Sequence, residues 1–114
     1  MKTEEKRKHQ RFDSLNLSYV CLDEDQRAIK QGMGRTLNLS ESGILLETHF
    51  PIEERHAIVL SIGLGDDLVD VRGRRVHVNA LEQGLYEIGI EFVDPEETVI
   101  RSIRQILQAL SQER

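Results

Sequence analysis

Residues Arg35-Thr-Leu-Asn-Leu-Ser-Glu-Ser-Gly-Ile-Leu-Leu-Glu47 contain two short apolar runs on either side of a polar segment, residues 38–43. Short apolar runs bounded by polar residues are typical of strands. Asn and Ser favour turns because their side chains hydrogen-bond to nearby backbone groups. The stretch therefore predicts two strands joined by a turn. Whether the turn is also half of a binding site depends on what else in the chain can face it.

Similar patterns extend outward from this stretch in both directions. Period-two alternation or short apolar runs predict six strands. They are residues 15–22, a segment ending near Leu39, and residues 44–48, 57–62, 69–78 and 85–93. Residues 69–78 are compatible with one long strand or with two short strands, in which case Gly73 marks a bulge between them. Six short strands separated by turn signals indicate an antiparallel barrel, which leaves no open sheet edge.

The C-terminal segment has a different period. Asp94 suits the N-cap of a helix, Pro95 the first helical position and Glu97 the third, as in a capping box. Apolar residues then recur at helical spacing, namely Val99, Ile100, Ile103, Ile106, Leu107 and Leu110. We expect this apolar face to pack on the end of the barrel rather than on a partner protein.

The predicted fold is mainly β, a six-stranded antiparallel barrel with a C-terminal α-helix. The 114 residues suit a single domain. We divide it into a flexible basic arm at residues 1–11, a barrel at residues 12–93 and a helix at residues 94–112.

Charge is distributed unevenly along the chain. Residues 1–11 carry five basic and two acidic side chains, whereas residues 12–114 carry 10 basic and 18 acidic ones. An acidic body repels long polyanions, so nucleic acid is not expected as a partner. A small anion held by the basic arm remains compatible with this distribution.

Several classes of protein are disfavoured. No apolar run approaches the roughly 20 residues of a membrane helix, and no apolar stretch follows the N-terminal charges as in a secretory signal. Cys21 is the only cysteine, which excludes an intramolecular disulfide and suits a small core residue. We expect a cytoplasmic protein that does not insert into a membrane.

Signals of enzymatic chemistry are also weak. The four histidines, His9, His49, His56 and His77, show no metal-ligand spacing. The serines lack a nucleophile-elbow motif. We therefore expect no catalytic residues, no metal site and no cofactor, and we interpret the histidines as solvated or satisfied side chains.

Two short patterns stand out from this background. Arg7 and Arg11 are four residues apart, and Asn38, Ser40 and Gly43 follow later in the chain. In this order they resemble the PilZ family of bacterial cyclic di-GMP receptors, which is marked by R-x-x-x-R before the first barrel strand and [D/N]-x-S-x-x-G between the second and third strands. A strand such as residues 86–92 followed by a helix is also usual there, so the resemblance covers nearly the whole chain.

The resemblance implies cyclic di-GMP as the ligand, with Arg7, Arg11, Asn38, Ser40 and Gly43 in its site and Lys6 as a further phosphate contact. Guanidinium groups suit this ligand because they fork onto phosphate oxygens, bond guanine O6 and N7, and stack on bases. Asn38 offers an acceptor and a donor to a guanine edge, and Ser40 can donate to a phosphate or to N7. Gly43 permits a close backbone approach or a positive φ.

Because the arm is charged and has no apolar periodicity beside an otherwise regular barrel, we expect a receptor or adaptor that orders this arm on binding and signals to an unidentified downstream protein. Nothing in the sequence indicates an attached catalytic domain, so we expect the output to pass through that partner. A PilZ-like protein-interaction adaptor that binds no nucleotide is the main alternative. A small nucleic-acid-binding barrel is a weaker one, because the acidic body lacks aromatic residues for base stacking.

Overall fold

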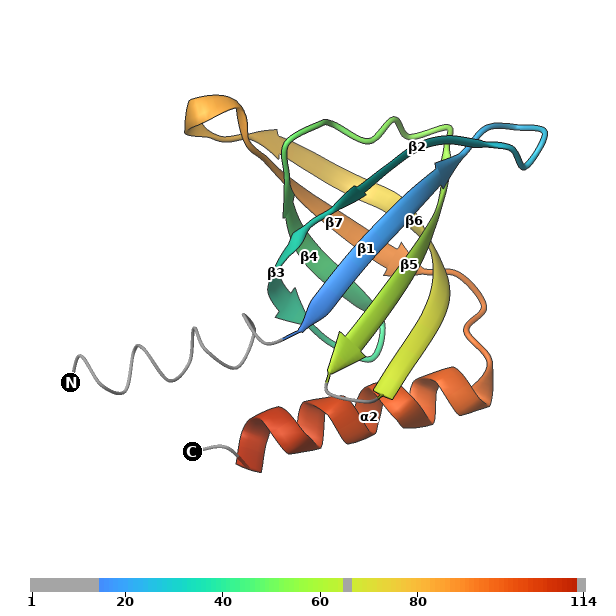
Figure 1. Cartoon of the computed structure of the whole chain (residues 1–114), viewed down its shortest axis with the longest axis vertical. Helices are drawn as coiled ribbons and strands as arrows, with labels where there is room; N and C mark the ends of the chain where they lie inside the picture. Colours follow the sequence, from blue (N-terminus) through green and yellow to red (C-terminus); the bar gives the residue numbers. More distant parts are fainter. Residues whose placement is uncertain (1–14, 65–66, 113–114) are drawn as a thin grey trace.

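The computed structural model describes residues 15–64 and 67–112, so Lys6, Arg7, Arg11 and the predicted basic arm lie outside the described residues. The described chain forms a single antiparallel sheet and a C-terminal helix (Figure 1). Its elements are β1 (Asn16–Leu22), β2 (Ala28–Met33), β3 (Arg35–Leu39), β4 (Gly43–Thr48), β5 (Ala57–Leu64), β6 (Asp67–Ala80), a 3-10 turn (Glu82–Gly84), β7 (Tyr86–Phe92) and α2 (Glu97–Gln112).

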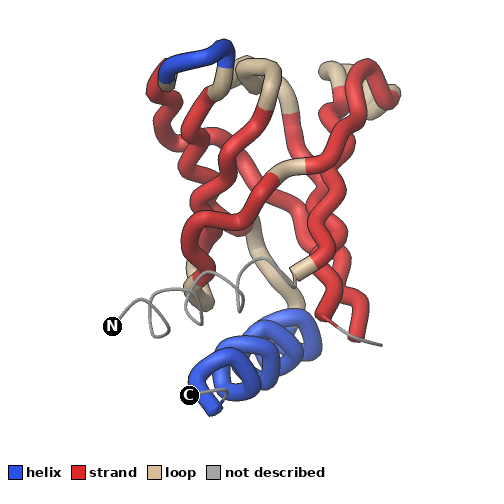
Figure 2. The backbone as a smooth tube through the Cα atoms, turned by 60° about the vertical axis from the view of Figure 1, so that its left-hand side comes forward, coloured by secondary structure: helices blue, strands red, loops and turns tan. Residues whose placement is uncertain are grey.

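The two outer strands of the sheet are consecutive in sequence. The strand order is β2-β1-β5-β6-β7-β4-β3, yet only Gly34 separates the end of β2 from the start of β3. The Gly34 amide donates to the Leu17 carbonyl of β1 at 3.4 Å, and a methyl group at Gly34 would lie 3.5 Å from Thr48 Cγ2 of β4. The sheet is therefore curled into a half-barrel whose edges approach each other at Gly34 (Figure 2).

The predicted mainly β fold with a C-terminal helix is confirmed. The sheet has seven strands instead of six, because residues 28–33, for which no strand was predicted, form β2. Before Gly34 the chain pairs with β1, and after it the chain pairs with β4. The boundary between β2 and β3 at Gly34 therefore coincides with a change of pairing partner.

Residues 67–80 form one long strand, β6, rather than two short ones. Gly73 is the residue at which its pairing passes from β5 to β7, and a Cβ there would lie 2.5 Å from Ile90 Cγ2. The bulge, which we expected at Gly73, lies instead between Arg75 and His77. Gly73 is therefore explained by close packing at the bend of the sheet.

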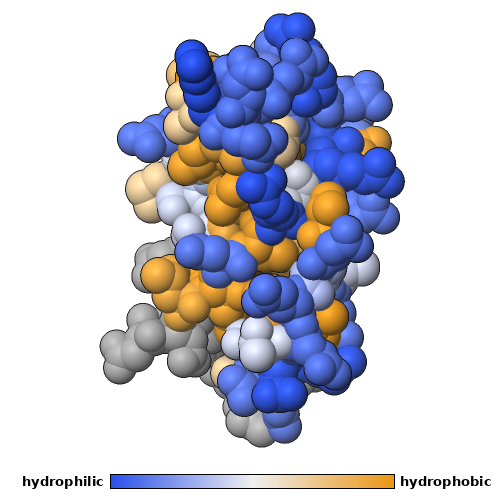
Figure 3. Space-filling model, turned by 90° about the vertical axis from the view of Figure 1, so that its right-hand side faces the viewer, coloured by the Kyte–Doolittle hydropathy of each residue, from blue (hydrophilic) through white to orange (hydrophobic). Residues whose placement is uncertain are grey.

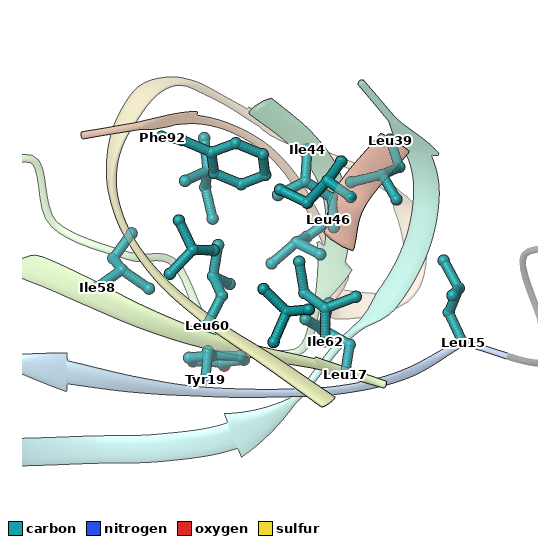
Figure 4. Close-up of a cluster of buried hydrophobic side chains, with 14 of the residues drawn as sticks. Leu15, Leu17, Tyr19, Leu39, Ile44, Leu46, Ile58, Leu60, Ile62 and Phe92 are labelled. Carbon is teal, nitrogen blue, oxygen red and sulfur yellow. The ribbon is translucent and has the colours of Figure 1, made fainter. Parts of the chain in front are cut away.

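The core is aliphatic and lies inside the curl of the sheet (Figure 4). On β1 the side chains of Leu17, Tyr19 and Cys21 are buried whereas Ser18 is exposed, as period-two alternation predicts. Cys21 is the small core residue that we expected. Leu15 and Leu39 lie at the same end of this core.

Helix α2 crosses one end of the half-barrel (Figure 1). Ile103, Ile106 and Leu110 are buried in the same core as the strands, which confirms packing on the barrel end. The helix begins at Glu97, two residues after Pro95, the predicted first helical position. The first helical hydrogen bond runs from the Ile100 amide to the Glu96 carbonyl, and Asp94 has a φ of 43°. Asp94 thus forms part of the preceding bend, and Glu96 occupies the N-cap position.

Within the described part of the chain, no helix has both the length and the apolar character needed to cross a bilayer.

Candidate functional site

The polar segment between β3 and β4 is the turn that the sequence predicted, and Ser40 organises it. The Ser40 amide donates to the Gly43 carbonyl at 2.9 Å. In the other direction, the Ser40 Oγ accepts from the amides of Ser42 and Gly43 at 3.3 and 3.2 Å. Short hydroxyl side chains commonly stabilise turns in this way. The turn is exposed, so the Ser40 hydroxyl is also accessible to a ligand.

Gly43 is required by its neighbours in the sheet. A methyl group at Gly43 would overlap the carbonyl oxygen of Ile90 on β7, and Gly43 is paired with the next residue of β7, Glu91. Its φ is not positive. The sequence offered two reasons for this glycine, a positive φ or a close backbone approach. The structure supports the close approach, and the backbone that approaches Gly43 is that of β7.

An open groove of about 300 Å³ runs from this turn across the sheet. Asn38, Ser40 and Gly43 line it together, so the structure brings together the three predicted site residues that it describes. The other predicted residues, Lys6, Arg7 and Arg11, lie outside the described part. The opposite wall comes from β6 and β7, through residues that include His77 and Gly89.

Two carboxylates, one lining the groove and one in the adjacent turn, are paired with arginines. Glu91 lines the groove, and its Oε1 lies 2.9 Å from Nη2 of Arg74. Glu41, in the β3–β4 turn, contacts Arg104 Nε of α2 at 3.0 Å. Exposed pairs of this kind contribute little to stability, about 0–1 kcal/mol each. They do reduce the negative charge that an anionic ligand meets, so the groove can accept an anion if further basic groups are supplied.

Asn38 presents its side chain at the end of β3. Its Oδ1 accepts a hydrogen bond from the Leu39 amide at 2.9 Å, which fixes the orientation of the carboxamide. An amide has two acceptor lone pairs and two donor hydrogens. A single local hydrogen bond therefore leaves Asn38 able to bond the edge of a base.

Sequence reasoning missed the far wall of the groove. His77 and Gly89 were not identified as site residues, because no local pattern marks them. They line the groove only because β6 and β7 pair in a register that places His77 opposite Gly89. The alternation of β7 indicated a strand, but no sequence pattern indicates which strands lie next to it in the sheet.

A second surface feature lies on another face. Figure 3 shows a band of apolar side chains flanked by polar ones on the side of the molecule where β5 and β6 lie. Two depressions there share Val93 and Arg72, and neither is lined by a described motif residue. The groove next to the β3–β4 turn is therefore the candidate site.

A small, curled antiparallel sheet, closed at one end by a helix and grooved beside its β3–β4 turn, defines a class of compact β-domains. The family model of the PilZ domain matches residues 5–109, and the chain belongs to the PilZ domain family. The matched range includes both of the sequence patterns described above. PilZ domains are generally receptors for cyclic di-GMP. No curated protein matches the chain.

Solved PilZ structures share the fold. K. pneumonia MrkH in its apo state is 18% identical with a TM-score of 0.59, and the similarity covers 86% of this chain and 47% of MrkH. The PilZ domain of CeSA from a cellulose-synthesizing bacterium is 12% identical with a TM-score of 0.59, over 84% of this chain and 93% of that domain. The chain thus spans about half the length of MrkH. At these identities the similarity concerns the fold.

Proposed function

We propose that this chain is a cytoplasmic receptor for cyclic di-GMP that binds the nucleotide in the groove and signals to a partner protein. The observation that carries the proposal is the meeting of Asn38, Ser40 and Gly43 at one end of a groove in a chain of the PilZ family. The role is binding rather than catalysis, because these are groups that recognise a ligand by hydrogen bonds and close contact.

Each described residue of the motif has a distinct role in this proposal. Asn38 bonds a guanine edge with its carboxamide. Ser40 donates its hydroxyl to a phosphate or to guanine N7, while its oxygen continues to hold the turn. Gly43 keeps β4 against β7, which sets the position of the turn and keeps the mouth of the groove free of a side chain.

Positive charge comes from the N-terminal arm. Arg7 and Arg11 bind the phosphates and stack on or bond the bases, and Lys6 adds a phosphate contact. The start of β1 and the end of β3 lie at the same end of the sheet (Figure 1). Arg11 precedes Leu15 by four residues, and four extended residues span about 13 Å. We propose that the arm closes over the groove from this point of attachment.

Binding orders the arm at a cost of about 1–2 kcal/mol per backbone residue, which several charge-assisted hydrogen bonds offset. The ordered arm is one surface that a partner can recognise. Helix α2 is another, because the Glu41–Arg104 pair connects it to the ligand-binding turn. A shift of the turn on binding is thereby passed to the helix.

Isothermal titration of the full chain with cyclic di-GMP tests this function, with separate titrations of cyclic di-AMP and GTP as controls. We expect micromolar or tighter binding of cyclic di-GMP that is lost in Arg7→Ala and Arg11→Ala and retained in Arg55→Ala. Arg55 is a suitable control because it pairs with Glu53 in the β4–β5 loop, outside the residues that line the groove. Hydrogen exchange of residues 1–11 should slow at saturating ligand. Unchanged exchange would refute arm ordering, and the absence of binding would refute the receptor function.

An adaptor that binds no nucleotide is the second candidate. One observation favours it: Asn38 Oδ1 and Ser40 Oγ already have hydrogen-bond partners within the turn, so their presence is explained without a ligand. The same titration separates the two candidates, because the adaptor gives no heat with cyclic di-GMP.

A further inference from the structure

One row of residues runs across four strands of the sheet. Asn38 of β3 is opposite Leu45 of β4, Leu45 is opposite Gly89 of β7, and Gly89 is opposite His77 of β6. Directly opposite residues in antiparallel strands point to the same face of the sheet. Asn38 and His77 are both exposed, so this is the outer face, and all four residues line the groove.

A register shift accompanies each polar end of this row. Pairing shifts between Thr36 and Asn38 on β3, and again between Arg75 and His77 on β6. Bulges re-aim the side chains that follow them and are over-represented beside functional sites. Here one bulge precedes the motif residue Asn38, and the other precedes His77, which no motif includes.

The His77 ring lies over the backbone of Gly89. A methyl group at Gly89 would overlap Cε1 of the imidazole and lie 3.0 Å from its Nε2. The absence of a side chain at Gly89 is therefore what allows the ring to lie flat on the sheet. Because His77 is exposed and lines the groove, the other face of the ring is open to a ligand. Aromatic rings presented in this way stack on nucleobases.

The charges beside the row favour a base over a phosphate at His77. The row itself contains no carboxylate, lysine or arginine. On one side of the row lie Gly43 and Glu91, which are paired across β4 and β7, and Glu91 forms an ion pair with Arg74. On the other side lies Glu87, which accepts a hydrogen bond from Asn79 at 3.2 Å. A phosphate at His77 would have carboxylates on both sides, whereas an uncharged purine would not be repelled.

The row is also long. Three strand spacings of about 4.8 Å separate β3 from β6, so its ends are roughly 14 Å apart along the sheet. A ligand that contacts both ends needs two recognition groups. A dinucleotide with two bases meets this requirement, whereas a single base can occupy only one end.

We propose that His77, held flat over Gly89, is a stacking platform for one purine base of the cyclic dinucleotide, at the opposite end of the groove from Asn38. This assignment rests on the proposed receptor function. It adds to the motif residues a base-stacking position on β6, and it gives Gly89 a role in shaping the site.

Titration calorimetry of the full chain with cyclic di-GMP tests the platform through two substitutions at one position. His77→Ala removes the ring, and we expect affinity to fall about 5- to 150-fold, the range for loss of one base–aromatic stack. His77→Phe retains a flat ring, and we expect affinity within about fivefold of the wild type. His49→Ala is the matched control, because His49 is exposed outside the residues that line the groove, and we expect no change.

The outcomes separate this inference from the proposed function. If the wild type binds cyclic di-GMP and His77→Ala binds it with the same affinity, the stacking platform is overturned and the receptor function is left intact. A loss in His77→Phe as large as in His77→Ala would overturn stacking as the role of the ring. No binding by the wild type would overturn both proposals. Melting temperatures of all variants, which we expect to match the wild type, confirm that the comparison concerns folded protein.

Discussion

Arg104 of helix α2 and Glu41 of the β3–β4 turn form an ion pair, with Nε and Oε2 separated by 3.0 Å. The two residues belong to elements far apart in sequence, and the pair fastens the helix to the turn that carries Ser40. Substituting Arg104 by Ala leaves Glu41 unneutralised beside the proposed nucleotide. We expect affinity for cyclic di-GMP to fall about two- to fivefold at low salt, in line with the strength of an exposed pair.

The control for Arg104→Ala is Arg101→Ala on the same helix, since Arg101 forms no ion pair with any described residue. Titrations at low salt and at 1 M salt should show the effect shrinking, because the Debye length falls to about 3 Å at 1 M. Equal affinities of the two variants at low salt would argue against an electrostatic role for the pair.

Arg74 should be needed to neutralise Glu91 in the groove. The pair is close, at 2.9 Å, and its loss in Arg74→Ala places an unpaired carboxylate near the dianionic ligand. We expect about two- to fivefold weaker binding, restored in the double variant Arg74→Ala/Glu91→Gln. Titration calorimetry measures the affinities of the single and the double variant. If the double variant binds as weakly as Arg74→Ala, the arginine acts by a direct ligand contact and not by neutralising Glu91.

Gly43 should matter for stability before it matters for binding. A methyl group there overlaps the Ile90 carbonyl, so β4 and β7 must separate. We expect Gly43→Ala to lower the free energy of unfolding by about 1–3 kcal/mol, as overpacking does, measured by urea denaturation. Gly34→Ala is the matched control, because its methyl group would lie 3.4 Å from the nearest atom, the Glu47 carbonyl oxygen. A fully stable Gly43→Ala variant would indicate that this glycine serves only the ligand.

The buried thiol of Cys21 should be unreactive in the folded protein. Burial raises its pKa, although nearby Lys30 acts to lower it, and only the thiolate is nucleophilic. Because the folded pKa is above the unfolded one, the unfolded state loses its proton first as pH rises. Stability contributed by this group is therefore full below the unfolded pKa, about 8.5, and falls as pH rises above it.

Two measurements check the behaviour of Cys21. Labelling with a thiol reagent at pH 8 should follow the unfolding transition in urea rather than precede it. Urea denaturation at pH 7 and pH 10 should show a smaller loss of stability in Cys21→Ala than in the wild type. Rapid labelling of the native protein at pH 8 would contradict the burial argument.

Much of this fold was predictable from local pattern. The alternation at Leu17, Tyr19 and Cys21 predicted a half-buried strand, and the 3.6-residue period around Ile103 predicted a helix, because both depend only on neighbours along the chain. The capping residue was misplaced, since Asp94 takes a positive φ where the chain bends between β7 and α2. Strand β2 was not predicted, because its side chains are almost all exposed and show no alternation between buried and exposed positions.

The candidate site was predictable only on one side. Asn38, Ser40 and Gly43 lie within six consecutive residues, so their proximity follows from chain connectivity alone. His77 and Gly89 are 12 residues apart and join Asn38 only through the pairing of β3, β4, β7 and β6. Sequence periodicity determined which segments are strands and which of their residues point to each of the two faces of the sheet. Tertiary structure decided which strands are neighbours and where bulges shift their register, because these depend on contacts between residues distant in the chain.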